Sequence, residues 1–135
     1  MILFVLQVLL LLYFFGCIVT YKIGNRILVE GVGIHSPEFI MFLLYGTGIF
    51  IHIVNKSIGR GYIFIVLGIW LLIQFSCHWY YTIFGVSDKK LKGYNECFKN
   101  TIRLFPMSET RLIPDLYHIM LHILILINII FICFS

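Results

Sequence analysis

The stretch PDLYHIMLHILILINIIFICF, residues 114–134, decides the fold class of this chain. At 1.5 Å of rise per residue, about 20 helical residues cover the roughly 30 Å hydrocarbon core of a bilayer. Pro114 suits the first turn of a helix, where a missing N–H costs little stability. The stretch therefore predicts a transmembrane helix.

Three further apolar stretches are long enough to be candidate spans, at residues 1–21, 38–54 and 62–84. Residues 38–54 form the shortest of them and contain His52. In lipid such runs must be helical, because an open strand would leave backbone groups without hydrogen bonds. We predict an all-α integral membrane protein, in which residues 1–135 form one transmembrane domain, a four-span antiparallel helix bundle.

Composition supports lipid as the solvent. Hydrophobic residues make up 61% of the chain and charged residues 12%, with a mean hydropathy of +1.00. A soluble domain usually carries about 25% charged residues. The first stretch lacks the positive n-region of a signal peptide, since Lys22 and Arg26 follow it rather than precede it. We expect a retained membrane anchor.

The distribution of Lys and Arg predicts the orientation. The first and third loops together hold eight of the ten basic residues, and the second loop holds Lys56 and Arg60. Because cytoplasmic loops are enriched in Lys and Arg, we expect both termini outside and residues 86–113 as a cytoplasmic basic loop. A bacterial cytoplasmic membrane is the expected location.

That basic loop contains a helical stripe. Apolar residues recur at spacings of three and four, at Leu91, Tyr94, Phe98, Ile102 and Phe105. The pattern predicts an amphipathic interfacial helix that starts near Asp88, ends before Pro106 and lies apolar side down on the inner membrane face. Its basic residues either enforce the topology or are offered to anionic lipid or to a partner protein.

Ionisable residues inside spans are rare and costly, so their positions are informative. Asp115, His118 and His122 are spaced i, i+3 and i+7, which places them on one helical face. In the antiparallel topology His78 of the third span reaches the same inner half of the membrane. Two further polar residues lie toward this side, His35 and Glu38, whereas His52 falls at the outer end of its span.

The candidate site therefore consists of His78, Asp115, His118 and His122. Four interpretations remain open: a structural polar network, a zinc or iron site, a haem held by two facing histidines, or passage of protons or ions. In a metal site Asp115 would ligate the metal or orient a ligating histidine, and a metal-bound water would be the reactive group.

The motif carries only short resemblances. His118-x-x-x-His122 is similar to one histidine element of the membrane desaturases and hydroxylases, which use several such boxes. Five histidines in the whole chain disfavour a di-iron oxygenase. The pattern Asp115-x-x-His118-x-x-x-His122 resembles the final motif of the membrane ceramidase and adiponectin-receptor group, which has seven spans. Each likeness covers half a helix, and neither assigns a family.

Other classes of function lack support. Tyr45-Gly-Thr-Gly48 provides small residues for close helix approach rather than a nucleotide loop. The formal net charge of +4 is modest and explained by the membrane, so no nucleic-acid partner is expected. We expect a small membrane protein that acts as an accessory or binding subunit. The alternative is a metal-dependent membrane enzyme or a haem-binding protein.

Overall fold

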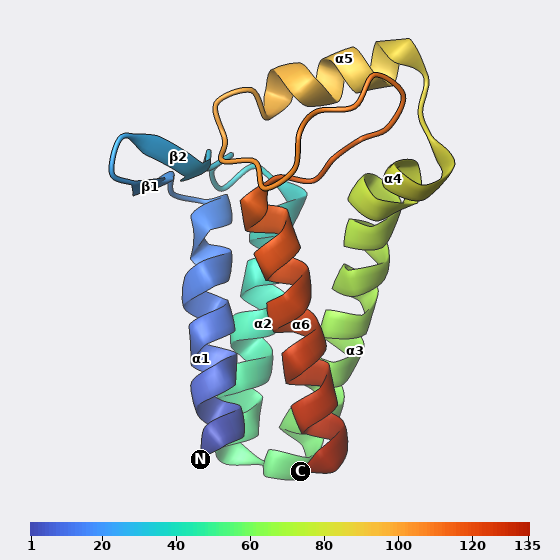
Figure 1. The fold of residues 1–135 in the computed structure, drawn as a ribbon. Helices are drawn as coiled ribbons and strands as arrows, with labels where there is room; N and C mark the ends of the chain where they lie inside the picture. The colour runs from blue at the N-terminus through green and yellow to red at the C-terminus, as the bar shows by residue number, and fades with distance from the viewer.

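The computed structural model describes residues 1–135, and most of them are helical. The elements in chain order are α1 (Ile2–Phe14), η1 (Phe15–Cys17), β1 (Tyr21–Ile23), β2 (Arg26–Val29), α2 (Pro37–Val54), α3 (Lys56–Gln74), η2 (Phe75–Trp79), α4 (Tyr80–Phe84), α5 (Asp88–Cys97) and α6 (Leu116–Phe134). In Figure 1, α1, α2, α3 and α6 lie side by side, with both termini at one end. The hairpin β1–β2 and helix α5 lie at the opposite end, which we call the capped end.

Three helical segments are long and apolar enough to cross a membrane: Pro37–Val54, Lys56–Phe84 and Leu116–Phe134. Each corresponds to a span predicted from the sequence. The apolar helix Ile2–Cys17 is shorter than the stretch 1–21 predicted for it. The helix ends at Cys17 because the following residues pair as a hairpin. The hairpin packs closely on this end, since a Cβ on Gly16 would lie 2.9 Å from the side chains of Tyr21 and Val29.

The hairpin is a correction to the all-α prediction. Strands β1 and β2 pair antiparallel around Gly24, which has a positive φ of 60°. A Gly-Asn turn between two short runs of strand-forming residues is an ordinary hairpin signal. Ile27 also forms a parallel bridge with Thr101, so the hairpin continues into the segment that follows α5.

The turn between α2 and α3 is shorter than predicted. Asn55 ends α2 and also caps α3, since its side-chain oxygen accepts a hydrogen bond from the Ile58 N–H. Helix α3 therefore starts at Lys56 rather than at residue 62, and the two basic residues of this loop lie in its first turns. A one-residue connection fixes α2 and α3 as antiparallel neighbours.

The core lies between the four long helices and carries several polar anchors. Tyr13 and Tyr117 each donate a hydroxyl hydrogen bond to the other's carbonyl, at 3.2 and 2.9 Å, with ring centroids 4.7 Å apart. Near the other end, Gln7 Oε1 bonds His52 Nδ1 at 2.8 Å. Large apolar side chains remain exposed on the outside of the helices. Such a surface suits lipid better than water.

Gly48 allows the close approach of α2 and α3. A Cβ at Gly48 would lie 2.7 Å from Ile63 Cγ1 and 2.9 Å from the Tyr62 ring, whereas one at Gly46 would only touch Leu11 at 3.9 Å. We expect Gly48→Ala to lower the free energy of unfolding by about 1–3 kcal/mol, because Ile63 is fully buried and cannot yield. Thermal unfolding in detergent should show this loss, with Gly46→Ala as the control that loses no stability. Equal behaviour of the two variants would refute the close contact.

Candidate functional site

The site begins at the N-terminus of α6, where Asp115 is the helix cap. Its Oδ1 accepts a hydrogen bond from the His118 backbone N–H at 3.0 Å, as helix N-caps do. The same oxygen bonds His118 Nδ1 at 2.6 Å. Because a carboxylate only accepts, the imidazole must donate from Nδ1. Asp115 is completely buried, so this local sequence holds one histidine in a fixed orientation.

His78 reaches this pair from the helical segment that follows α3. It lies in η2, a π-helical turn that interrupts the regular helix before α4. Such turns insert one extra residue and rotate the following side chains, often at functional sites. The His78 and His118 rings lie 4.1 Å apart between centroids, tilted by 33°. His78 Nδ1 is also 2.7 Å from the Tyr94 hydroxyl of α5.

Tyr94 joins α5, in the capped end, to the helix bundle. Burial raises the pKa of its hydroxyl, and the charge of Asp115 raises it further. Tyr94 therefore keeps its proton at neutral pH, and its hydroxyl shares a hydrogen bond with His78 Nδ1. The result is a continuous series of side-chain contacts, from Tyr94 through His78 and His118 to Asp115, that connects α5, η2 and α6. We call this chain the His–Asp network.

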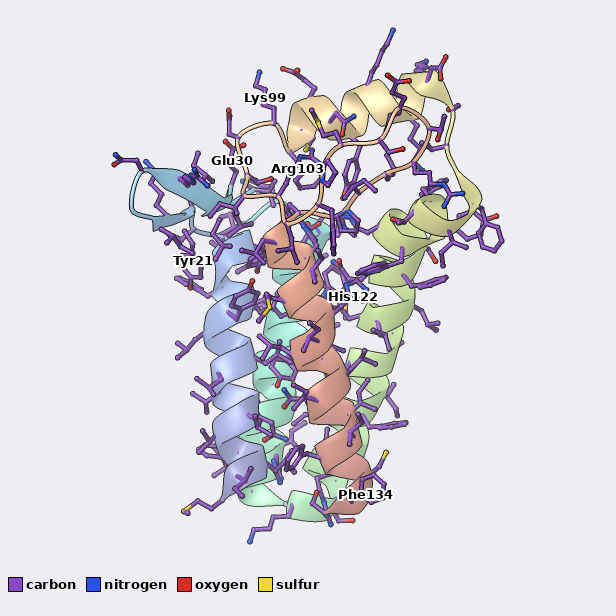
Figure 2. The ribbon with its side chains drawn as sticks, viewed as in Figure 1. Tyr21, Glu30, Lys99, Arg103, His122 and Phe134 are labelled. Atoms are coloured by element: carbon purple, nitrogen blue, oxygen red, sulfur yellow. The ribbon has the colours of Figure 1, made fainter.

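His122 lies one turn further along α6 and joins the network only through backbone. Its Nδ1 donates to the His118 carbonyl at 3.0 Å, and its ring lies edge-on to Trp79. The other ring nitrogen, Nε2, is buried without a hydrogen-bond partner, as is Asp115 Oδ2. In Figure 2 the label of His122 lies beside α6 and α3, well below Arg103 in the capped end.

Three of the four predicted residues, His78, Asp115 and His118, come together, and His122 lies one turn further along α6. No three His, Cys, Asp or Glu side chains in the chain are grouped so that they could hold one metal ion. The Nδ1 atoms of His78, His118 and His122 are all engaged in hydrogen bonds. This geometry fits a polar network that links helices. Binding of zinc, iron or haem by these residues stays a prediction.

The other polar residues at this end behave differently from one another. His35 is exposed on the segment before α2 and makes no hydrogen bond with the His–Asp network. Glu38 is half-buried in the first turn of α2 and lines a cavity that His118 also lines. His52 lies at the far end, bonded to Gln7, as its predicted depth requires.

The predicted interfacial helix is shorter than expected, and Tyr94 on its apolar side contacts the bundle through His78. Helix α5 ends at Cys97, because Thr101 and Ile102 pair with Ile27 of the hairpin. The apolar side of α5 packs on the bundle, with Leu91 buried and the Phe98 ring 5.2 Å from that of His118. The apolar stripe was the sequence signal for this contact, but it could not identify Tyr94 as a site residue.

Arg103 holds the segment after α5 in place. Its Nη1 donates to the Ile113 carbonyl at 3.0 Å, and its Nη2 lies 3.4 Å from Asn95 Oδ1. Nearby, the Lys90 ammonium lies 3.6 Å from the centre of the Tyr81 ring, a cation–π distance. Some of the basic residues in segment 86–113 therefore stabilise the capped end itself.

We expect Tyr94→Phe to loosen α5. Loss of one hydrogen bond to a buried imidazole should cost about 1 kcal/mol, which corresponds to roughly fivefold faster amide exchange in residues 88–97. Hydrogen exchange read by mass spectrometry tests this directly. Tyr80→Phe is the matched control, because the Tyr80 side chain is exposed and its hydroxyl makes no hydrogen bond. Unchanged exchange in Tyr94→Phe would mean that the bond does not hold α5.

No family model, curated protein or solved structure matches the chain. Function must therefore be inferred from the site itself.

Proposed function

We propose that this chain is a four-span membrane protein that acts as an accessory or binding subunit and offers its basic capped end to an acidic partner protein. The termini would lie outside a bacterial cytoplasmic membrane and the capped end inside. Helix α1 would be the fourth span. Together with η1 it forms the 16-residue segment Ile2–Cys17, which covers about 24 Å, and a bilayer can thin or the flanking residues can adjust to match a short helix.

The observation that carries the proposal is the free charge on α5. Lys89 and Lys92 are exposed and take part in no ion pair or hydrogen bond, while Leu91 between them is buried. The helix thus holds its lysines on a fixed support. Eight of the ten basic residues lie at this end, which is the arrangement that cytoplasmic loops favour.

The packing of α5 favours a protein partner over lipid. An interfacial helix binds lipid by burying its apolar side in the membrane. Here Leu91 is already buried within the protein, and Tyr94 is already hydrogen-bonded to His78. The charged side remains, and complementary charge gives specificity and association rate in protein complexes.

The partner can be tested with charge-removing variants. We expect the double variant Lys89→Gln/Lys92→Gln to fold normally but to recover several-fold less of any crosslinked membrane partner. Its recovery should fall less steeply with added salt than that of the wild type, because fewer charges remain to be screened. Lys56→Gln/Arg60→Gln removes the same charge from the opposite end and should recover the wild-type amount. Equal recovery in both variants, or a lone monomer in wild type, would contradict the proposal.

A metal-dependent membrane enzyme or haem protein is the second candidate, and one observation favours it. Asp115 Oδ2 and His122 Nε2 are both buried without partners. Elemental analysis and the Soret absorption of purified protein should then show near-stoichiometric metal or haem. His118→Ala/His122→Ala should remove that content without unfolding the bundle. A metal-free, haem-free protein would contradict this candidate and leave the His–Asp network as a structural device.

A further inference from the structure

A cavity of about 200 Å³ lies where the bundle meets its cap, and we call it the cap cavity. Its walls come from α1, α2, α3 and α6 below and from the hairpin side and the end of α5 above. At about 30 Å³ for each water molecule, it could hold several waters or one small organic molecule. Residues at its rim, including Glu30 and Cys97, are exposed, which places its mouth between the hairpin and α5.

The wall of the cap cavity is aromatic and acidic. Four rings line it, and so do two carboxylates, whereas no Lys or Arg does; the rings and carboxylates are those of Phe14, Trp70, Phe98, Tyr117, Glu30 and Glu38. The charged residues of the cavity wall are thus negative, whereas the whole chain carries a net charge of +4. Aromatic faces and carboxylates both attract organic cations.

Three polar groups in this wall lack partners. Gln74 is 4% exposed and its Oε1 accepts no hydrogen bond, and Trp70 is 2% exposed with an Nε1–H that donates none. Glu38 forms no ion pair, although it is half-buried. Glu30, by contrast, accepts a hydrogen bond from Asn100. Buried polar groups are nearly always paired in native proteins, so unpaired ones at a cavity indicate a missing partner.

The free groups define the chemistry of that partner. Glu38 and Gln74 Oε1 are acceptors and require a donor with positive charge, such as an ammonium group. Trp70 Nε1 is a donor and requires an acceptor, such as a hydroxyl or ester oxygen. We propose that the cap cavity binds a small amino alcohol, either free in the cytoplasm or as the ammonium headgroup of a phospholipid.

This site is distinct from the basic outer face of α5, so the inference does not depend on the proposed partner protein. It shares only His118 with the His–Asp network. Cation binding here is compatible with that network, because the Nδ1 of His118 is turned toward Asp115.

The probe for the free form is ethanolamine, titrated into full-length protein in a maltoside detergent. The readout is the Trp70 indole N–H resonance, identified among the two tryptophans with a Trp79→Phe variant. We expect saturable shifts with a Kd of about 0.1–10 mM, the range open to so small a ligand. Ethylene glycol, which lacks the ammonium group, should give no saturable shift. Equal shifts with both compounds would overturn the proposal.

Two variants separate binding from folding. Glu38→Gln should weaken ethanolamine about tenfold or more, because it removes a charge-assisted contact but keeps the size of the side chain. Glu109→Gln, on an exposed part of the same end, should bind as wild type. Gln74→Leu should also weaken binding. If Glu38→Gln and Gln74→Leu both leave ethanolamine binding unchanged, ethanolamine binds outside the cap cavity and the proposal fails.

The lipid source is tested in nanodiscs. Discs of phosphatidylethanolamine should reproduce the Trp70 shift if a headgroup enters the cavity, relative to discs of phosphatidylglycerol. A shift with free ethanolamine but not in these discs assigns the cavity to a soluble amine. Absence of both shifts would overturn the inference.

Discussion

Asp115→Ala is expected to destabilise the protein by about 3 kcal/mol. The cap of α6 contributes about 1 kcal/mol, and a further 1–3 kcal/mol follows from leaving the buried His118 Nδ1–H without an acceptor. Unfolding in mixed micelles of dodecyl sulfate and a mild detergent measures the loss. Because the Phe98 ring packs against that of His118, we expect the segment 98–110 to become more sensitive to protease as well.

Two controls locate the cause of that loss. Asp115→Asn keeps a side-chain oxygen for the His118 backbone N–H, so it should retain part of the capping energy and lose the charged contact. Asp88→Ala removes an exposed carboxylate from the first turn of α5 and should change stability by less than about 0.5 kcal/mol. If Asp115→Ala loses as little stability as Asp88→Ala, the His–Asp network does not hold the capped end to the bundle.

Gly59→Ala should be at least as damaging. A Cβ at this position would lie 2.2 Å from His52 Cα and 2.3 Å from His52 N, which are backbone atoms of the preceding helix. The one-residue turn at Asn55 prevents α2 and α3 from separating locally. We expect a loss of about 3 kcal/mol or more, at the upper end of overpacking effects. The Gln7 contact to His52 should be lost in the same variant.

Gly61→Ala is the matched control in the same helix. Nothing lies within 4 Å of a Cβ at Gly61, so the substitution should gain about 0.5–1 kcal/mol from helix propensity. Thermal unfolding followed by circular dichroism in detergent compares the two variants. Similar stability for Gly59→Ala and Gly61→Ala would show that α2 and α3 do not approach as closely as described.

The sequence alone determined the parts of the structure that depend on neighbours along the chain. Pro114 and Asp115 locate the start of α6 because capping is a local interaction. The spacing of three between Asp115 and His118 brings them together in any helix. Runs of apolar residues identified the long helices for the same reason: their pattern follows from the solvent that each segment requires.

Tertiary structure decided everything that requires a partner far along the chain. Tyr94 and His78 are 16 residues apart, and only the packing of α5 across the bundle joins them. The hairpin takes Thr101 and Ile102 out of the predicted interfacial helix, a competition between two backbone pairings that a stripe of apolar residues cannot resolve.

The grouping of His78, Asp115 and His118 in the candidate site was thus available from the sequence, because an antiparallel arrangement brings these positions to the same level. Its chemistry was not. The direction of each imidazole nitrogen depends on which acceptor the fold brings within reach, and here Asp115, Tyr94 and a backbone carbonyl engage the three Nδ1 atoms. The apolar stretches determine that this chain forms three helices long and apolar enough to cross a membrane. The packing of its cap decides which polar groups are satisfied and which, around the cap cavity, remain free to bind.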